Sequence, residues 1–287
     1  MLAGGYCAAG RGDAESLSAR IIPFQMDAIA PNASVPLPVR TVAVNRPLHW
    51  LRLGWFDFVR TPAAGLAHGA VVALAGWFTI LLAPQAWWLA PGAVSGFVLV
   101  APILCTGLYE LSRLLGRGAQ PGLADAMHAW RRDAAPLVGL GVLLTVLGTA
   151  WVLVSSLLFW MFVKASIATP LEFIRYAVVG QGNVAFTLWL LAGGLGSALV
   201  FALTAVSPPL LLGRRVGLRC ALLTSVRAVG ENPVAMAAWA ALILAAIALS
   251  LATAMLGFLL AVPVIGHATW HAYRELVVTD GVPLRSE

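Results

Sequence analysis

The sequence has very little charge for its length. Of its 287 residues, 10% are charged and 60% are hydrophobic. A soluble domain carries about 25% charged residues, so this chain cannot cover a globular surface with polar groups. The composition excludes a soluble globular protein and predicts an integral membrane protein. The net charge of +6 is then an orientation signal rather than a sign of nucleic-acid binding.

The sequence also lacks the patterns that mark common catalytic and metal sites. Its three cysteines, Cys7, Cys105 and Cys220, are far apart and form no CxxC pair, whereas thiolate metal sites need clustered sulfurs. No GxSxG, HExxH, Walker A or Rossmann glycine pattern is present. We therefore expect neither an enzyme nor a bound cofactor.

Long apolar runs predict an all-α membrane protein with six transmembrane helices. A span needs about 20 apolar residues, and four runs satisfy this at about 66–88, 92–111, 137–163 and 185–212. The run 234–273 is too long for one span, and we expect it to divide near 254–257 into a fifth and a sixth.

The basic residues predict the orientation of these spans. With six spans, all Lys and Arg except Lys164 and Arg175 fall on one side of the membrane. Because cytoplasmic loops are enriched in Lys and Arg, both termini should lie in the cytoplasm. Five spans would place the C-terminus outside and fit the charges less well.

A threefold repeat is suggested by three basic amphipathic segments, each followed by a pair of spans. The segments cover 48–62, 122–136 and 217–233, and each suits the membrane interface, with apolar side chains toward lipid. The arginines in the first two segments, and those in and just before the third, are expected to contact anionic headgroups. These are Arg52, Arg60, Arg131, Arg132, Arg214, Arg215, Arg219 and Arg227.

The second span of each pair contains prolines that are expected to break the helix. They are Pro102, Pro208, Pro209 and Pro263. Each unit would then be an interfacial helix followed by a two-helix hairpin, and three parallel units suggest a pseudo-threefold axis along the membrane normal.

Spans two and six align without gaps, as "GFVLVAPILCTGLYELSR" and "GFLLAVPVIGHATWHAYR". The alignment predicts a polar cluster at the inner leaflet, in which Glu110 meets His271, since an acid near the bilayer needs a partner. The cluster would comprise Glu110, Arg113, His271, Arg274, Tyr109 and Trp270. In the alternative, Glu110 pairs with Arg113 or Arg117 on its own helix.

His267 and His271 stand four residues apart and so share one helix face. With His68 of the first span they are candidate ligands for a haem or a transition metal. Packing or placement at the interface is the favoured interpretation, and proton handling is a further one.

The ends of the chain differ from its centre. Residues 1–44 are rich in Ala, Gly, Pro and Ser and are expected to form a disordered tail. Met26 would also make a plausible start, so 1–25 could be an extension. The membrane domain would then cover 45–277, with a C-terminal tail at 278–287.

Three strings together resemble one family: "GLYELSRLLGRGAQPGLADAMHAWRR", "LLTSVRAVGENPVAMAAWAALI" and "VPVIGHATWHAYREL". It is the bacterial predicted integral membrane protein family known as domain of unknown function 2189, and the resemblance covers roughly residues 40–278. It implies a multi-pass protein of the bacterial inner membrane and supplies no activity, cofactor or substrate.

The function expected from these features is a non-enzymatic accessory, assembly or scaffolding component. Its basic cytoplasmic face would bind anionic lipid, and it could associate with another membrane complex or with itself. A transporter or channel for a small solute is one alternative, and a haem or metal subunit using His68, His267 and His271 is another.

Overall fold

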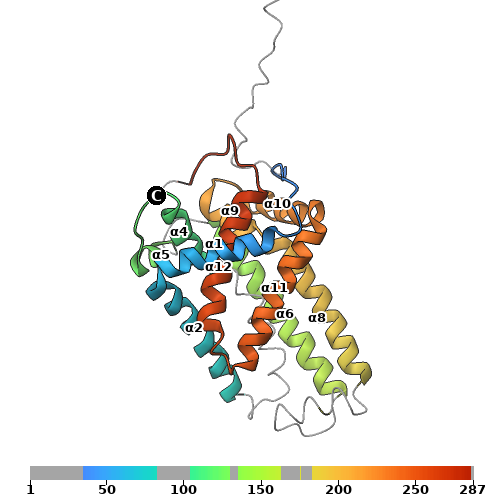
Figure 1. Cartoon of the computed structure of the whole chain (residues 1–287). Helices are drawn as coiled ribbons and strands as arrows, with labels where there is room; N and C mark the ends of the chain where they lie inside the picture. Colours follow the sequence, from blue (N-terminus) through green and yellow to red (C-terminus); the bar gives the residue numbers. More distant parts are fainter. Residues whose placement is uncertain (1–34, 83–103, 130–134, 163–174, 176–182, 286–287) are drawn as a thin grey trace, which may run out of the picture.

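A computed structural model of the chain describes residues 35–82, 104–129, 135–162, 175 and 183–285 (Figure 1). The regular structure in these residues is helical, apart from two isolated β-bridges. The helices are α1 (Arg46–Arg60), α2 (Pro62–Leu82), α4 (Thr106–Leu115), α5 (Leu123–His128), α6 (Ala135–Phe162), α8 (Asn183–Thr204), α9 (Ser207–Gly213), α10 (Leu218–Glu231), α11 (Pro233–Ala252) and α12 (Phe258–Leu276). The predicted all-α class is confirmed.

Four stretches of the described chain are long and apolar enough to cross a membrane. They are Pro62–Thr79, Ala135–Leu158, Phe186–Gly213 and Pro233–Ala252, and they match the expected spans one, three, four and five. Most of span two lies outside the described residues. Span six corresponds to α12, whose polar C-terminal half lowers its hydropathy, and the six-span count stays a prediction.

The long apolar run divides where the sequence suggested. α11 ends at Ala252 and α12 begins at Phe258. Between them, Ala254 and Met255 adopt left-handed backbone angles, with φ of 49° and 70°. Non-glycine residues rarely do so because the side chain crowds the following carbonyl. The turn is tied to α2, since the Trp77 indole N–H donates to the Ala254 carbonyl at 2.9 Å.

The prolines have two different effects. Pro208 and Pro209 lie in the first turn of α9, directly after the break that ends α8, so these two do interrupt a span. Pro263 lies inside the continuous helix α12, and the prediction of a break there was wrong. Proline removes the N–H that would bond the carbonyl of Leu259, four residues earlier. That carbonyl lies against Gly69 of α2, where a Cβ would be 2.9 Å away. Pro102 is outside the described residues.

The short helices gather at one end of the bundle, and α2, α6, α8 and α11 extend from it (Figure 1). α1 packs on α12, α5 packs on α4, and α10 packs on α9 and α8. In addition, α4, α9 and α12 contact one another in all three pairs. Each amphipathic helix therefore packs on a helix that belongs to a different pair of spans.

Residues 35–45 form an extended segment, here called the N-terminal strap, across this end. Leu37 is buried, and its N–H donates to the Thr224 hydroxyl at 2.9 Å. Val39 forms an antiparallel bridge with Val277. Residues 35–44 of the predicted disordered tail are therefore held in place by specific contacts. Residues 1–34 lie outside the described part of the chain.

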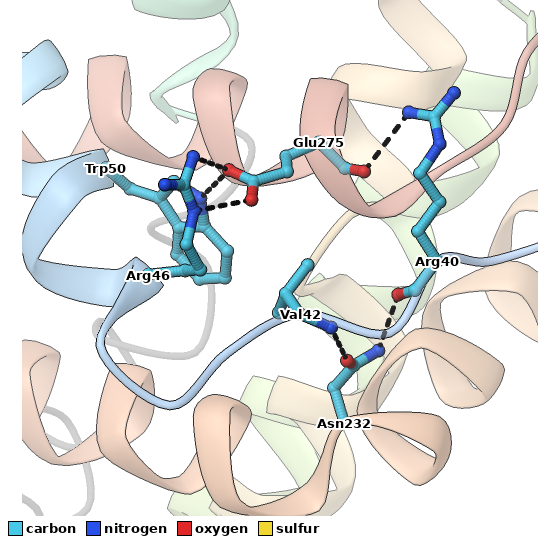
Figure 2. Close-up of polar contacts among 6 residues, drawn as sticks. All are labelled: Arg40, Val42, Arg46, Trp50, Asn232 and Glu275. Carbon is cyan, nitrogen blue, oxygen red and sulfur yellow. Dashed lines mark hydrogen bonds and ion pairs between the residues drawn. The ribbon is translucent and has the colours of Figure 1, made fainter.

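Two polar clamps fix the strap and the start of α1, which follows it (Figure 2). The Glu275 carboxylate accepts from the Arg46 guanidinium at 2.6 and 2.9 Å and from the Trp50 indole at 2.8 Å. The Asn232 side chain accepts from the Val42 N–H at 2.8 Å and donates to the Arg40 carbonyl at 3.0 Å. The start of the described chain is thus tied to the ends of α10 and α12.

The C-terminal segment is also held at this end. Leu284 forms an antiparallel bridge with Arg214. The Arg285 guanidinium donates to the Leu211 carbonyl at 2.8 Å, and the Arg214 guanidinium donates to the Val282 carbonyl at 2.6 Å. Residues 278–285 of the predicted C-terminal tail therefore pack against the end of α9.

Candidate functional site: a buried polar network

The site forms where α1 crosses α12 and α4. Trp50, Gly54 and Asp57 are spaced three or four residues apart, so they share the buried face of α1. At Gly54 a Cβ atom would lie only 2.4 Å from the Val264 carbonyl oxygen and 2.7 Å from the Ala268 nitrogen. The absence of a side chain at this position lets the two helix backbones touch, and Asp57, one turn later, is carried into the interior.

Five polar residues are linked there by hydrogen bonds. Asp57 Oδ2 accepts from the Ser112 hydroxyl at 2.7 Å and lies 2.8 Å from His271 Nε2. The Ser112 oxygen is also 2.7 Å from His267 Nδ1. The ring closes through Thr61, whose hydroxyl oxygen is 3.4 Å from His267 Nε2 and donates to the Asp57 carbonyl at 3.0 Å.

The network runs from the surface into the interior. The His271 side chain is 24% exposed, whereas Asp57, Ser112 and His267 are buried and His267 is 0% exposed. Burial alone would raise the pKa of Asp57, but hydrogen bonds from His271 and Ser112 outweigh it and hold this pKa below its usual value. Asp57 is therefore a carboxylate at neutral pH and the negative centre of the network.

The predicted meeting of Glu110 and His271 is replaced by two separate pairs. Glu110 accepts two bonds from the Arg113 guanidinium, both at 2.7 Å, and both side chains are buried on α4. This is the intrahelical alternative, in a bidentate form that offsets the cost of burial. His271 turns instead to Asp57, because Gly54 brings α1 within reach of α12.

The other predicted members of the cluster lie around these pairs rather than in them. Tyr109 is buried on α4. Trp270 is also buried, with its ring 5.3 Å from that of Tyr273. Arg274 is exposed. The structure therefore places the polar chemistry on Asp57 and its partners.

The histidines do not converge on one ligand site. His68 Nδ1 is 2.8 Å from the Ala64 carbonyl oxygen. Its Nε2 atom faces α4, 2.6 Å from where a Cβ on Gly107 would lie. Both nitrogens of His267 face hydroxyl groups. Within the described ranges, no group of three His, Cys, Asp or Glu could hold a metal ion, so the haem or metal hypothesis gains no support there.

Most of the arginines expected at lipid headgroups lie on the surface. Arg52, Arg60, Arg215, Arg219 and Arg227 are exposed, and Arg227 also pairs with Glu231 at 2.6 Å. Arg214 is an exception because its guanidinium holds the Val282 carbonyl. Arg131 and Arg132 lie outside the described residues.

Sequence reasoning missed Asp57 and Ser112. Asp57 is the only acid in the amphipathic segment 48–62, where it follows two apolar residues, with a glycine one turn earlier. The available signal was a single acid that shares a helix face with a glycine. Ser112 had no comparable signal, because a serine in a helix is common and its role depends on which helices surround it.

Residues 89–213 match the model of a family described as predicted integral membrane protein (DUF2189). The resemblance noted from the sequence is thus confirmed, and the chain is an integral membrane protein. No curated protein and no solved structure matches it.

Proposed function

We propose that this membrane protein is built from three related units closed into a ring, with six spans and both termini in the cytoplasm. The packing supports this arrangement. α1 of the first unit packs on α12 of the third, α5 of the second on α4 of the first, and α10 of the third on α9 of the second. In each case the amphipathic helix of one unit packs on the last helix of the preceding unit, and the third unit precedes the first. A threefold ring requires this repeated contact.

Details of the first and third units support a common origin. Thr61, between α1 and α2, has φ and ψ of −130° and 50°, and Asn232, between α10 and α11, has −129° and 50°. Each is followed by a proline that starts the next helix. When the two prolines are aligned, the buried Trp50, Gly54 and Asp57 correspond to Ala221, Ser225 and Ala228. These three residues are also buried.

The proposed cytoplasmic end carries both charge and exposed apolar side chains. The exposed arginines named above lie on α1, α10 and the segment before α10. Large apolar residues on the amphipathic helices are also exposed, among them Leu48, Trp55, Met127 and Val226. Apolar side chains beside arginines are the pattern of helices that lie in an anionic lipid surface.

From this combination we infer a non-enzymatic scaffolding or assembly component of the cytoplasmic membrane. Its rigid basic end, held by both terminal segments, would bind anionic lipid and present a fixed surface to a partner membrane complex. The observation that carries the inference is the gathering of exposed arginines and apolar side chains at the end where all three units meet.

The lipid part of this proposal is tested by native mass spectrometry of the full chain released from mixed anionic and neutral nanodiscs. The triple variant Arg52→Gln, Arg215→Gln, Arg219→Gln should lose most of the anionic lipid that the wild type retains. Arg175→Gln is the control, because Arg175 is exposed and lies on the opposite side in the six-span arrangement. Equal retention by the triple variant and the control would refute lipid binding at this end.

A further inference from the structure

We propose that His267 is a buried proton-binding site, at which an imidazolium is held between the hydroxyls of Thr61 and Ser112 with Asp57 as its counter-charge. This assigns the network a role in proton handling, which goes beyond scaffolding. It rests on the hydrogen-bond geometry of described residues and not on the ring of three units.

The argument begins with the protons of the two hydroxyls. A serine or threonine hydroxyl has one proton to donate and lone pairs to accept with. Ser112 donates its proton to the Asp57 carboxylate at 2.7 Å, and Thr61 donates its proton to the Asp57 carbonyl at 3.0 Å. Both oxygens therefore present lone pairs to the His267 ring.

A ring between two acceptors is best satisfied with two N–H groups. Neutral histidine has one N–H and one lone pair, so one of its nitrogens would face an oxygen lone pair. The doubly protonated ring donates Nδ1–H to Ser112 at 2.7 Å and Nε2–H toward Thr61 at 3.4 Å. Proton uptake is a transfer from hydronium: one of its O–H bonds breaks as the new N–H bond forms, and a water molecule is left.

The surrounding charges include one that favours this proton and several that oppose it. Burial opposes it most strongly, Asp57 of α1 favours it, and His271 of α12 and His68 of α2 oppose it. On α4, Glu110 and Arg113 neutralise each other, and Arg274 of α12 is exposed to solvent. Burial is the largest of these effects and opposes the charge, so the charged ring depends on the two directed hydroxyls and on the Asp57 carboxylate behind Ser112.

His271 gives the site access to solvent, because its side chain is 24% exposed. Its half-buried ring contacts the same Asp57 oxygen that Ser112 contacts. Water can therefore reach the rim of the network while His267 itself stays dry.

The experiment is nitrogen-15 NMR of the full chain, labelled at histidine and held in nanodiscs. The five histidines are assigned by replacing His49, His68, His128 and His271 one at a time with Gln. At pH of about 6, wild-type His267 should show two protonated ring nitrogens. Thr61→Val keeps the side-chain shape but removes one acceptor, so the midpoint of His267 protonation should fall by about half a pH unit or more.

The matched control is Thr204→Val. Thr204 is also buried, and its hydroxyl donates to a carbonyl four residues earlier, at 2.7 Å, but that carbonyl belongs to Val200 and not to the network of His267. Its His267 signals should match those of the wild type. A neutral His267 in the wild type at this pH, or identical midpoints in Thr61→Val and Thr204→Val, would overturn the assignment. Asp57→Asn should lower the midpoint further, and an unchanged midpoint there would also overturn it.

Discussion

Asp57 offers the most informative perturbation of the fold, because one carboxylate ties α1 to both α4 and α12. Asp57→Ala removes the bonds from Ser112 and His271. A hydrogen bond to a charged group contributes about 1.5–3 kcal/mol, so the loss of two should lower the free energy of unfolding by about 3 kcal/mol or more. The measurement is reversible unfolding in mixed micelles, followed by tryptophan fluorescence.

The pH dependence of this effect has a defined sign. The pKa of Asp57 is lowered in the folded protein, so its stabilising contribution is complete above the unfolded value of about 3.9. The contribution is lost as the pH falls through the lower folded value. The gap between wild type and Asp57→Ala should therefore be widest at neutral pH and should narrow in acid, below pH of about 4.

The control is Asp280→Ala, at an exposed acid in the C-terminal segment, which should change the stability by less than about 0.5 kcal/mol. The reasoning would be refuted if Asp57→Ala were no more destabilising than Asp280→Ala, or if its effect grew as the pH fell below 4.

Three further predictions follow from packing and backbone geometry. Gly54→Ala should destabilise the fold by about 2 kcal/mol or more. Gly194→Ala should not, since a Cβ at Gly194 meets nothing within 4 Å. Equal unfolding midpoints for the two variants would contradict the close contact of α1 with α12. Glu275→Gln should raise the rate at which protease cuts the strap, because its bidentate pair with Arg46 is lost, and an unchanged cleavage rate would show that the clamp does not hold the strap. Ala254→Gly should stabilise the protein by about 0.5 kcal/mol, because glycine relieves the left-handed strain by more than it adds to the entropy of the unfolded chain. A lower melting temperature in this variant would count against that strain.

The sequence was informative wherever one helix determines the outcome. Apolar length located the helices that could span a membrane. The turn near Ala254 was predicted because one apolar run was too long for a single span. Pro62 and Pro233 start helices because a proline in the first turn loses no backbone hydrogen bond.

The sequence was less informative wherever two helices must meet. Pro263 was expected to break its helix, yet Gly69 of a neighbouring helix accommodates the freed carbonyl. His271 was paired with Glu110 through an alignment of two spans. Its actual partner is Asp57, and that contact depends on a glycine in a third helix.

The strap illustrates the same limit in an unstructured-looking segment. Its composition is that of a disordered tail, and its few apolar residues give no periodic pattern. Leu37 is nevertheless buried, because α10 and α12 supply the hydroxyl and the backbone groups that an extended chain needs. Order in such a segment comes from its partners, which no local pattern reveals.

The central claim is that three related units place all their basic ends in the cytoplasm, and labelling of single cysteines tests it most directly. In a chain with Cys7, Cys105 and Cys220 replaced, cysteines are introduced one at a time at Arg52, Arg117, Arg219 and Arg175. We predict that a membrane-impermeant maleimide added to intact cells labels only the Arg175 position, and that it labels the other three after the membrane is opened. Labelling of any of those three in intact cells would contradict the arrangement.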